Sequence, residues 1–250
     1  MHRFYIAPEN FDDAALALVG AEAHHCANVL RMQAGEQAVV FNGRGREVTA
    51  EIERIGGSEV HLRKLSERIT APLRYRITLG QAIPKGKNMD LIVQKAVELG
   101  AAEIAPLISE HTVVRLDRRD AVQKQAKWQT IAVEAAKQCG QNWLPHVAEP
   151  RTLAEFYSDS TRHDLQLVGS LQEDAVSFKN ALADFERQHV AGNAPRSVLI
   201  LIGPEGDFTA DELTLACRHG CRPISLGPIV LRVETAAIYC LSVLSYELLS

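Results

Sequence analysis

No apolar run in the sequence approaches the roughly 20 residues that a membrane-spanning helix needs. The first residues, MHRFYIAPENFDD, also lack the apolar stretch of a signal peptide. The chain has only five cysteines, which are scattered from Cys26 to Cys240 and include no CxxC pair. An odd number of scattered cysteines favours reduced thiols over a disulfide framework and provides no zinc motif. We therefore expect a cytoplasmic protein with no membrane association and no bound metal.

Internal repeats, low-complexity segments, a Walker phosphate-binding loop and the GxGxxG dinucleotide fingerprint are also missing. The composition is otherwise that of a folded globular protein, with 46% hydrophobic and 23% charged residues among 250. Disordered, collagen-like and coiled-coil classes do not have this composition. A chain of this length forms either one large domain or two small ones.

An overall excess of positive charge is absent, since 27 Lys and Arg stand against 31 Asp and Glu. The middle of the chain differs, because residues 74–141 contain 11 basic and 7 acidic side chains. Nucleic-acid binding needs a local cationic surface, not a cationic total. The middle segment is therefore a candidate RNA or DNA face. The alternative is a solvated helix surface with paired charges.

Residues 1–72 contain short β-type segments separated by turn signals. The predicted strands cover 2–7, 38–43, 46–55 and 59–65, and a short helix covers 24–32. The dipeptides Asn42-Gly43 and Gly56-Gly57 predict turns, because Asn and Gly accept the positive φ that tight turns demand. We expect a small β-barrel that acts as a binding module and ends at residue 72.

From residue 73 to 250, strands alternate with helices, which predicts an α/β domain with a mostly parallel sheet. The predicted strands cover 75–83, 103–107, 165–170, 197–203 and 223–227. Four helices are predicted. The first ends at Gly100, the second covers 117–139, the third runs from the capping-box segment 209–212 to Gly220, and the fourth covers 234–249.

The helix predicted over 117–139 has two different faces. One face is basic, with Lys124, Lys127 and Lys137. The other face is apolar and contains Val122, Trp128, Ile131, Ala132 and Ala135. This helix therefore carries much of the basic charge of the middle segment.

Two glycine-containing loops follow buried strands and precede helices. They are Gly203-Pro204-Glu205-Gly206 and the segment 226–235. Open α/β sheets bind ligands at the carboxyl ends of their strands. The second loop is rich in apolar residues, which suits an adenine-like ligand better than a polyphosphate. The alternative is a plain strand-to-helix connection without a ligand.

These loops also carry a resemblance to known enzymes. GPEGDFTADEL and LGPIVLRVETAAIYCL, in this order, resemble the signature of the SPOUT class of S-adenosylmethionine-dependent RNA methyltransferases. Four other stretches are similar to one family of that class, the 16S ribosomal RNA uridine-N3-methyltransferases of the small subunit. These stretches are HHCANVLRMQAGE, FNGRGREVTAEI, QAIPKGKNMDLIVQKAVELGAAEIAPLISEHTVV and AVEAAKQCGQNWLP. The resemblance covers nearly the whole chain.

The resemblance implies a PUA-like or OB-like RNA-binding barrel in residues 1–72 and a SPOUT domain with a trefoil knot in residues 73–250. It further implies a homodimer that binds S-adenosylmethionine and acts on 16S ribosomal RNA or on the assembled small subunit. The implied cofactor-binding residues are Gly169, Leu201, Gly203, Pro204, Glu205, Gly206, Leu226, Gly227, Leu231 and Arg232. The implied RNA-binding residues are Arg31, Arg44, Lys85, Lys87, Lys95, Lys124, Lys127 and Gln138. For Lys95, the alternative is a surface ion pair with Glu98.

Methylation at uridine N3 requires loss of the N3 proton, because the nitrogen is nucleophilic only without it. We assign Arg232 to stabilise the negative charge that develops on the uracil ring, since a guanidinium cannot act as a base. Glu234 or solvent would then accept the proton. The alternative for Glu234 is a charge that complements the helix dipole.

Three positions depart from the usual pattern of the family. Asp207 follows GPEG where the family has Gly, Gln141 stands where Arg is common, and Val233 replaces Thr in the Arg-Thr-Glu-Thr run. These departures affect substrate contacts more than the cofactor site. Two other functions stay open: a SPOUT enzyme that methylates ribose or a different base, and a non-catalytic RNA-binding or assembly factor.

The last helix suggests how two copies would associate. Its apolar residues span a wider arc than one core face requires, which predicts packing against a second subunit. These residues are Ala236, Ala237, Cys240, Leu241, Leu244 and Leu248.

Overall fold

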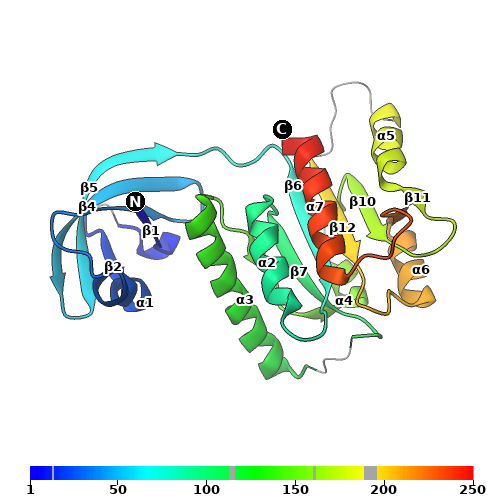
Figure 1. The fold of residues 1–250 in the computed structure, drawn as a ribbon, viewed down its shortest axis with the longest axis horizontal. Helices are drawn as coiled ribbons and strands as arrows, with labels where there is room; N and C mark the ends of the chain where they lie inside the picture. Colours follow the sequence, from blue (N-terminus) through cyan, green and yellow to red (C-terminus); the bar gives the residue numbers. More distant parts are fainter. Residues whose placement is uncertain (13, 113–115, 160–161, 189–195, 250) are drawn as a thin grey trace. The chain divides into compact units, whose positions relative to one another are not determined.

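The structure is a computed structural model, and it describes all residues except 13, 113–115, 160–161, 189–195 and 250. The chain divides into two compact units, coloured along the sequence in Figure 1. The first unit contains residues 1–72 and 133–144, and the second contains residues 73–132 and 145–250. A single boundary at residue 72 therefore does not describe the division, because a later segment returns to the first unit.

The first unit is built on a five-stranded sheet with the order β1-β3-β4-β5-β2. Its strands are β1 (His2–Tyr5), β2 (Ala17–Val19), β3 (Gln37–Phe41), β4 (Arg46–Gly56) and β5 (Glu59–Ile69). Its short helical turns are η1 (Pro8–Asn10), α1 (Gly20–His24) and η2 (His25–Val29). In the described residues β1 and β2 are edges that do not pair with each other, so the sheet is open where a closed barrel was expected.

Alternating side chains of this sheet form one core. Phe4, Leu18, Val40 and Ile52 are fully buried in it. The prediction missed β2 because three residues are too few to show an alternating pattern. The helical segment also begins at Gly20, four residues earlier than predicted.

The segment 133–144 is held to this unit by side-chain contacts. Asn142 Nδ2 donates to Thr70 Oγ1 at 2.9 Å, and Trp143 Nε1 donates to the Thr70 carbonyl at 2.9 Å. Lys137 is buried and its Nζ lies 3.1 Å from Glu22 Oε1 and 2.9 Å from Glu134 Oε1. The prediction of Lys137 on an exposed basic face was therefore wrong, because two carboxylates neutralise it inside the unit.

The second unit is a parallel sheet with the order β11-β13-β10-β12-β6-β7-β8, and β9 also pairs with β7. The strands are β6 (Arg76–Ala82), β7 (Glu103–Ile108), β8 (His146–Val147), β9 (Arg151–Thr152), β10 (Leu165–Gly169), β11 (Val176–Ser177), β12 (Ser197–Ile202) and β13 (Arg222–Ser225). The helices are α2 (Asn88–Glu98), α3 (Arg118–Cys139), α4 (Leu153–Asp159), α5 (Phe178–Gln188), α6 (Ala210–Arg218) and α7 (Val233–Leu249). The last residues of α3 belong to the first unit.

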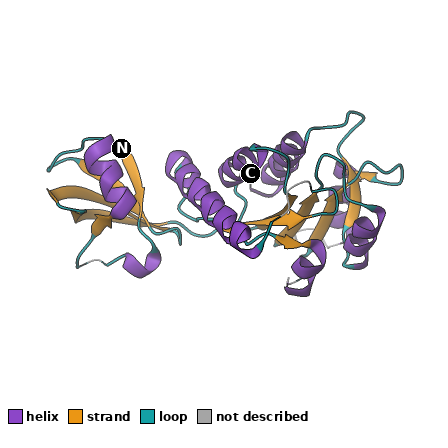
Figure 2. Ribbon diagram, turned by 90° about the horizontal axis from the view of Figure 1, so that it is seen from below, coloured by secondary structure: helices purple, strands orange, loops and turns teal. Residues whose placement is uncertain are grey.

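Helices cover both faces of the parallel sheet (Figure 2). On one face, Phe156 of α4 and Leu213 of α6 join a core with Leu199 and Leu201 of β12. On the other face, α7 packs against β6, β12 and the neighbouring α2. Side chains of a strand alternate between the two faces, so buried strands appear in the sequence as unbroken apolar runs. The five main strands were predicted for this reason, whereas α4, α5 and the two-residue strands were not.

The apolar arc of α7 does not need a second subunit to be covered. Ala236, Ala237, Cys240, Leu241 and Leu244 are all buried within the unit. The sheet and α2 thus cover five of the six residues of the predicted arc, and Leu248 is half-buried, so the arc by itself does not indicate a dimer. On α3, Val122 is 44% exposed, so its expected place on the apolar face was wrong as well.

Candidate functional site

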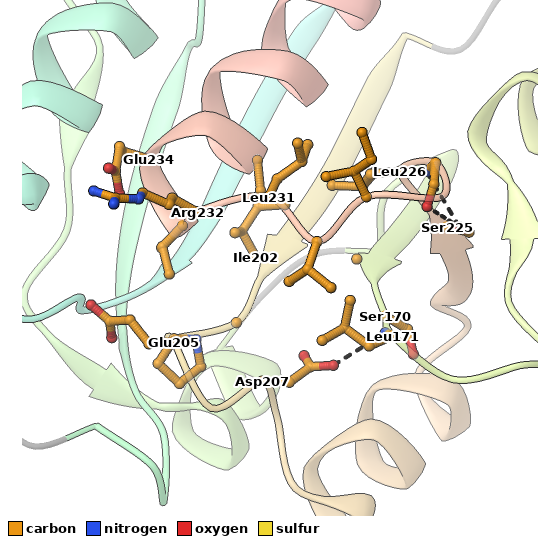
Figure 3. A pocket seen from close by; sticks show the side chains of 18 of the residues that line it. Ser170, Leu171, Ile202, Glu205, Asp207, Ser225, Leu226, Leu231, Arg232 and Glu234 are labelled. Carbon is orange, nitrogen blue, oxygen red and sulfur yellow. Dashed lines mark hydrogen bonds between the residues drawn. The ribbon is translucent and has the colours of Figure 1, made fainter.

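A cavity of about 650 Å³ opens at the carboxyl ends of the parallel strands β10, β12 and β13 (Figure 3). The last residues of these strands, Gly169, Ile202 and Ser225, all line it. The volume is in the range typical of small-molecule sites. Figure 3 shows Arg232 and Glu234 on one side of the cavity and Asp207 and Leu171 on another.

The loop after β12 forms one wall and is fixed by the start of α6. Thr209 and Glu212 make a reciprocal capping box, with the Thr209 side chain accepting from Glu212 N at 3.3 Å and Glu212 Oε2 accepting from Thr209 N at 2.9 Å. Glu212 Oε1 also accepts from Glu110 N at 3.1 Å, in the loop after β7. The capping box predicted from sequence is confirmed, and it anchors this wall to a neighbouring loop.

Two further contacts connect the same loop to its neighbours. Glu205 Oε1 accepts from the backbone N of Lys85 at 3.0 Å, in the loop after β6. Asp207 Oδ2 accepts from the backbone N of Leu171 at 3.2 Å, in the loop after β10. The loop after β12 is thus hydrogen-bonded to loops that follow two other strands of the sheet.

The segment 225–232 forms the opposite wall. Gly227 has a φ of +124°, which only glycine adopts readily, and a Cβ built there would meet no atom within 4 Å. The space beside Gly227 is therefore open to a ligand. Ile229 and Val230 are 74% and 72% exposed and provide an apolar rim.

Charged groups gather where this segment enters α7. Arg232 is exposed and, among the described residues, has no ion pair or hydrogen bond through its side chain, so it does not pair with Glu234. Glu234 Oε2 accepts a hydrogen bond from Asn88 Nδ2 at 3.1 Å. With Glu205, Asp207 and Glu234, three carboxylates and one guanidinium line the cavity. The cavity thus combines an apolar rim with an excess of negative charge.

The structure places most predicted cofactor residues at this cavity. Those that line it are Gly169, Gly203, Pro204, Glu205, Leu226, Gly227, Leu231 and Arg232. Leu201 does not line it, because its side chain is fully buried on the face of the sheet that carries α4 and α6. Gly206 does not line it either, since its α-carbon faces the His111 ring, which a Cβ would approach to 3.3 Å.

The predicted RNA-binding residues are divided between the two units. Arg31, Arg44 and Gln138 are exposed in the first unit. Lys85 and Lys87 are exposed in the loop that precedes Asn88, and neither has an ion pair among the described residues.

The remaining three lysines already interact with neighbouring side chains. Lys127 Nζ lies 2.6 Å from Asp90 Oδ2, Lys95 Nζ lies 2.8 Å from Glu98 Oε2, and Lys124 Nζ lies 5.6 Å from the centre of the Trp128 ring.

Sequence reasoning missed Asn88 and the cavity role of Asp207. Asn88 follows the loop after β6, and the carboxyl ends of parallel strands share one edge of a sheet. Inspecting every loop at that edge would have found it. The sequence marked Asp207 only as a departure from the family pattern, in which Gly follows GPEG.

Two buried cysteines of the second unit have strongly raised pKa values. Burial raises the pKa of Cys221 and of Cys240 to about 12, so both thiols stay protonated near neutral pH. Within the described ranges, no group of three or more His, Cys, Asp and Glu side chains is arranged to hold a metal ion.

The helices of that same part of the chain include none with the length and apolar character needed to cross a membrane.

Comparisons with known sequences point to one kind of enzyme. The sequence model of an RNA methyltransferase domain matches residues 71–245, and that of a PUA domain of RNA methyltransferases matches residues 18–65. Two proteins named ribosomal RNA small subunit methyltransferase E are similar over nearly the whole chain. The one from Synechocystis sp. is 32% identical, covering 96% of this chain and 76% of its own length. The one from Bacillus subtilis is 30% identical, covering 99% and 97%.

Solved structures agree in fold. A candidate methyltransferase of Legionella pneumophila, in complex with its cofactor S-adenosylmethionine, superposes with a TM-score of 0.85 at 36% identity, covering 98% of this chain and 97% of its own. The ribosomal RNA small subunit methyltransferase E of Neisseria gonorrhoeae, bound to S-adenosylmethionine, has a TM-score of 0.84 at 29% identity, covering 99% and 98%.

Proposed function

Because the chain belongs to the RNA methyltransferase family, we propose that it methylates N3 of a uridine in the 16S ribosomal RNA of the small subunit. S-adenosylmethionine is its cofactor and supplies the methyl group when bound. The observation that carries the proposal is the cavity at the ends of β10, β12 and β13, which brings Arg232 and Glu234 to one wall. Relatives of the same fold bind this cofactor.

The residues of the cavity fit such a cofactor. S-adenosylmethionine combines a flat adenine with a sulfonium and an ammonium, both positively charged. The apolar segment 226–231 offers a surface for the ring, and the space beside Gly227 lets backbone approach it. The carboxylates of Glu205, Asp207 and Glu234 suit a ligand with positive charge.

Arg232 and Glu234 have complementary roles in this proposal. The guanidinium stabilises negative charge on the uracil as the N3 proton leaves, and no side-chain partner among the described residues occupies its donors. Glu234 or solvent accepts that proton. Asn88 orients the Glu234 carboxylate through its amide. The chain thus aligns the base, stabilises its charge and holds the proton acceptor near the reacting atom.

RNA is bound by both units in this proposal. Arg31, Arg44 and Gln138 present polar side chains on the first unit, in which residues 18–65 match the PUA sequence model. Lys85 and Lys87, which form no ion pair within the described part of the chain, lie in the loop that precedes Asn88 of the cavity. Lys95, Lys124 and Lys127 add a weaker contribution, because their side chains already have partners. The substrate is free 16S ribosomal RNA or the assembled subunit, which places the enzyme in the cytoplasm.

The proposal includes a trefoil knot and a homodimer. The strand order supports the knot. After β13, which lies on the far side of β10 from β12, the chain returns across the sheet and α7 packs on β12 and β6.

For the dimer, the partly exposed Tyr239 of α7 and Leu91 of α2 provide apolar surface outside the buried arc. Light scattering at micromolar concentration would return twice the monomer mass of 27.5 kDa.

The test is nucleoside mass spectrometry of 16S ribosomal RNA from a strain without the gene and from the same strain with the gene restored. Restoration should return N3-methyluridine. Return of a 2′-O-methylated nucleoside, or of a nucleoside methylated on a different base, would show that the chain catalyses another methylation. Unchanged nucleosides together with no S-adenosylmethionine binding by calorimetry would indicate a non-catalytic RNA-binding protein.

A further inference from the structure

We propose that Asp207 is a positioning residue of the cofactor site, which fixes the 170–172 wall of the cavity against the loop after β12. The inference rests on the proposed function, because it concerns the cavity assigned to S-adenosylmethionine. It assigns to this side chain a task in cofactor binding that does not require contact with the reacting atoms.

The carboxylate of Asp207 joins two loops that are 36 residues apart in sequence. Oδ2 accepts from the backbone N of Leu171 at 3.2 Å, and Oδ1 accepts from the backbone N of Phe208 at 2.8 Å. Figure 3 shows the bond to the Leu171 loop as a dashed line at the cavity edge. Hydrogen bonds to a charged acceptor are stronger than those between neutral groups.

The backbone holds Asp207 in place from both sides. Its φ is +58°, a left-handed conformation that Asp tolerates better than most residues. Its N donates to the Pro204 carbonyl at 3.0 Å, and its own carbonyl accepts from His111 Nδ1 at 2.9 Å. Surroundings that fix a residue in a sparsely populated conformation are typical of functional sites.

Gly203 makes room for this carboxylate. A Cβ at Gly203 would lie 2.9 Å from Asp207 Oδ1, which is too close for a side chain in an unchanged loop. The glycine of the GPEG segment therefore accommodates Asp207 as well as lining the cavity.

The 170–172 wall depends on this contact at its centre. Ser170 N donates to the Ile224 carbonyl at 3.0 Å, but Leu171 is 65% exposed and packs little of its own surface. Without the carboxylate, the Leu171 amide loses its partner from the loop after β12. A wall that must be ordered during binding weakens affinity, whereas a wall ordered beforehand does not.

The test compares Asp207→Gly, Asp207→Asn and the control Asp211→Asn in the full-length chain. Glycine keeps the positive φ without strain and removes the carboxylate together with Cβ, whereas asparagine keeps Cβ and one acceptor oxygen and so controls for the added backbone freedom. Asp211 is an exposed carboxylate on α6 that does not line the cavity, so its variant controls for lost charge. Each variant is measured by hydrogen exchange of the Leu171 amide without ligand and by calorimetry with S-adenosylmethionine.

For Asp207→Gly we expect Leu171 exchange to accelerate at least tenfold and the affinity for S-adenosylmethionine to fall about tenfold, or about 1.4 kcal/mol. Asp207→Asn should lose about threefold in affinity, and Asp211→Asn should match the wild type. Unchanged Leu171 exchange would show that the contact does not order the wall. Faster exchange with unchanged affinity would show that the ordered wall is not needed for binding. If the wild-type chain itself binds no S-adenosylmethionine, the proposed function fails first, and Asp207 loses its assigned role with it.

Discussion

The side-chain amide of Asn88 donates a hydrogen bond to Glu234, with 3.1 Å between Nδ2 and Oε2. The two residues are 146 positions apart, and each lies in the first turn of its helix, α2 or α7. Because α2 and α7 pack side by side (Figure 1), the bond fixes the carboxylate at the cavity. The Asn88 amide thus holds one oxygen of the Glu234 carboxylate in place with a neutral hydrogen-bond donor.

Replacing Asn88 by Asp should therefore weaken catalysis. The variant loses the amide donor and sets a second negative charge beside the Glu234 carboxylate, which repels it from its place at the cavity. We expect the single-turnover methylation rate to fall about tenfold. Gln94→Asp, an exposed position on the same helix, adds the same charge away from Glu234 and should leave the rate unchanged. An unchanged rate in a folded Asn88→Asp protein would contradict the role of Glu234.

Arg232→Lys should reduce turnover without reducing stability. Lysine offers one mobile charge where arginine offers a planar fork of donors. We expect the methylation barrier to rise by roughly 2–4 kcal/mol, with cofactor affinity and thermal stability nearly unchanged. Single-turnover kinetics and thermal denaturation on the same preparation check this. Full turnover in a folded Arg232→Lys protein would remove Arg232 from the catalytic assignment.

Gly227→Val should abolish much of the cofactor affinity. The side chain would enter open space beside the cavity, and the φ of +124° would also strain the backbone. Gly57→Val controls for the strain, because Gly57 has a φ of +60°, has no neighbour within 4 Å and lies in the turn between β4 and β5. Both variants should lose about 1–3 kcal/mol of stability, and only Gly227→Val should lose more than tenfold in affinity by calorimetry. Equal affinities in the two variants would place the cofactor elsewhere.

The sequence predicted the architecture of the second unit well, and the reason is local. Strands β6, β7, β10, β12 and β13 carry their apolar runs and turn residues within a few positions, and the capping box of α6 is a four-residue pattern. The position of the loops that line the cavity follows from the rule that parallel strands end at one edge of the sheet.

Tertiary contacts decided what the sequence could not show. Lys137 appears in the sequence as one more basic residue of a helix, but Glu22, 115 positions away, neutralises it. Asn88 and Glu234 meet only because α2 and α7 pack together. The open edges of the first sheet depend on β2, a three-residue strand with almost no pattern of its own.

RNA affinity should depend on unpaired lysines more than on paired ones. Each lost phosphate contact lowers the slope of log affinity against log salt by up to about 0.9 for duplex and 0.7 for single strands. Replacing both Lys85 and Lys87 by Ala should lower the slope by up to about 1.4–1.8. Lys95→Ala, whose amine already pairs with Glu98, should change the slope much less. Equal slopes for the two variants, measured by filter binding across salt concentrations, would show that the RNA lies elsewhere.

The buried cation of the first unit gives the last prediction. Lys137 keeps 8% of its side-chain surface exposed, Glu22 keeps 19%, and Glu134 keeps 55%. Burial raises the pKa of Glu22 above its ordinary value, although the charge of Lys137 opposes the rise. Lys137→Met removes the cation and leaves the Glu22 carboxylate without compensation. Stability at pH 7.5 should fall by about 2 kcal/mol, less than for a fully buried pair because Glu22 retains some solvent.

The loss should shrink at lower pH. Without Lys137 the pKa of Glu22 rises further, so the folded state binds a proton that the unfolded state, with its pKa of about 4.5, does not. The stability gained by protonation is complete below pH 4.5 and disappears as the pH rises through the higher pKa of the folded state. Urea denaturation at pH 5 and 7.5 measures the difference, with Glu134→Gln as the exposed-partner control, expected to cost less than 1 kcal/mol. An equal loss at both pH values would show that Lys137 stabilises the unit by packing over Phe4, whose ring centre lies 5.8 Å from Nζ, and not by compensating Glu22.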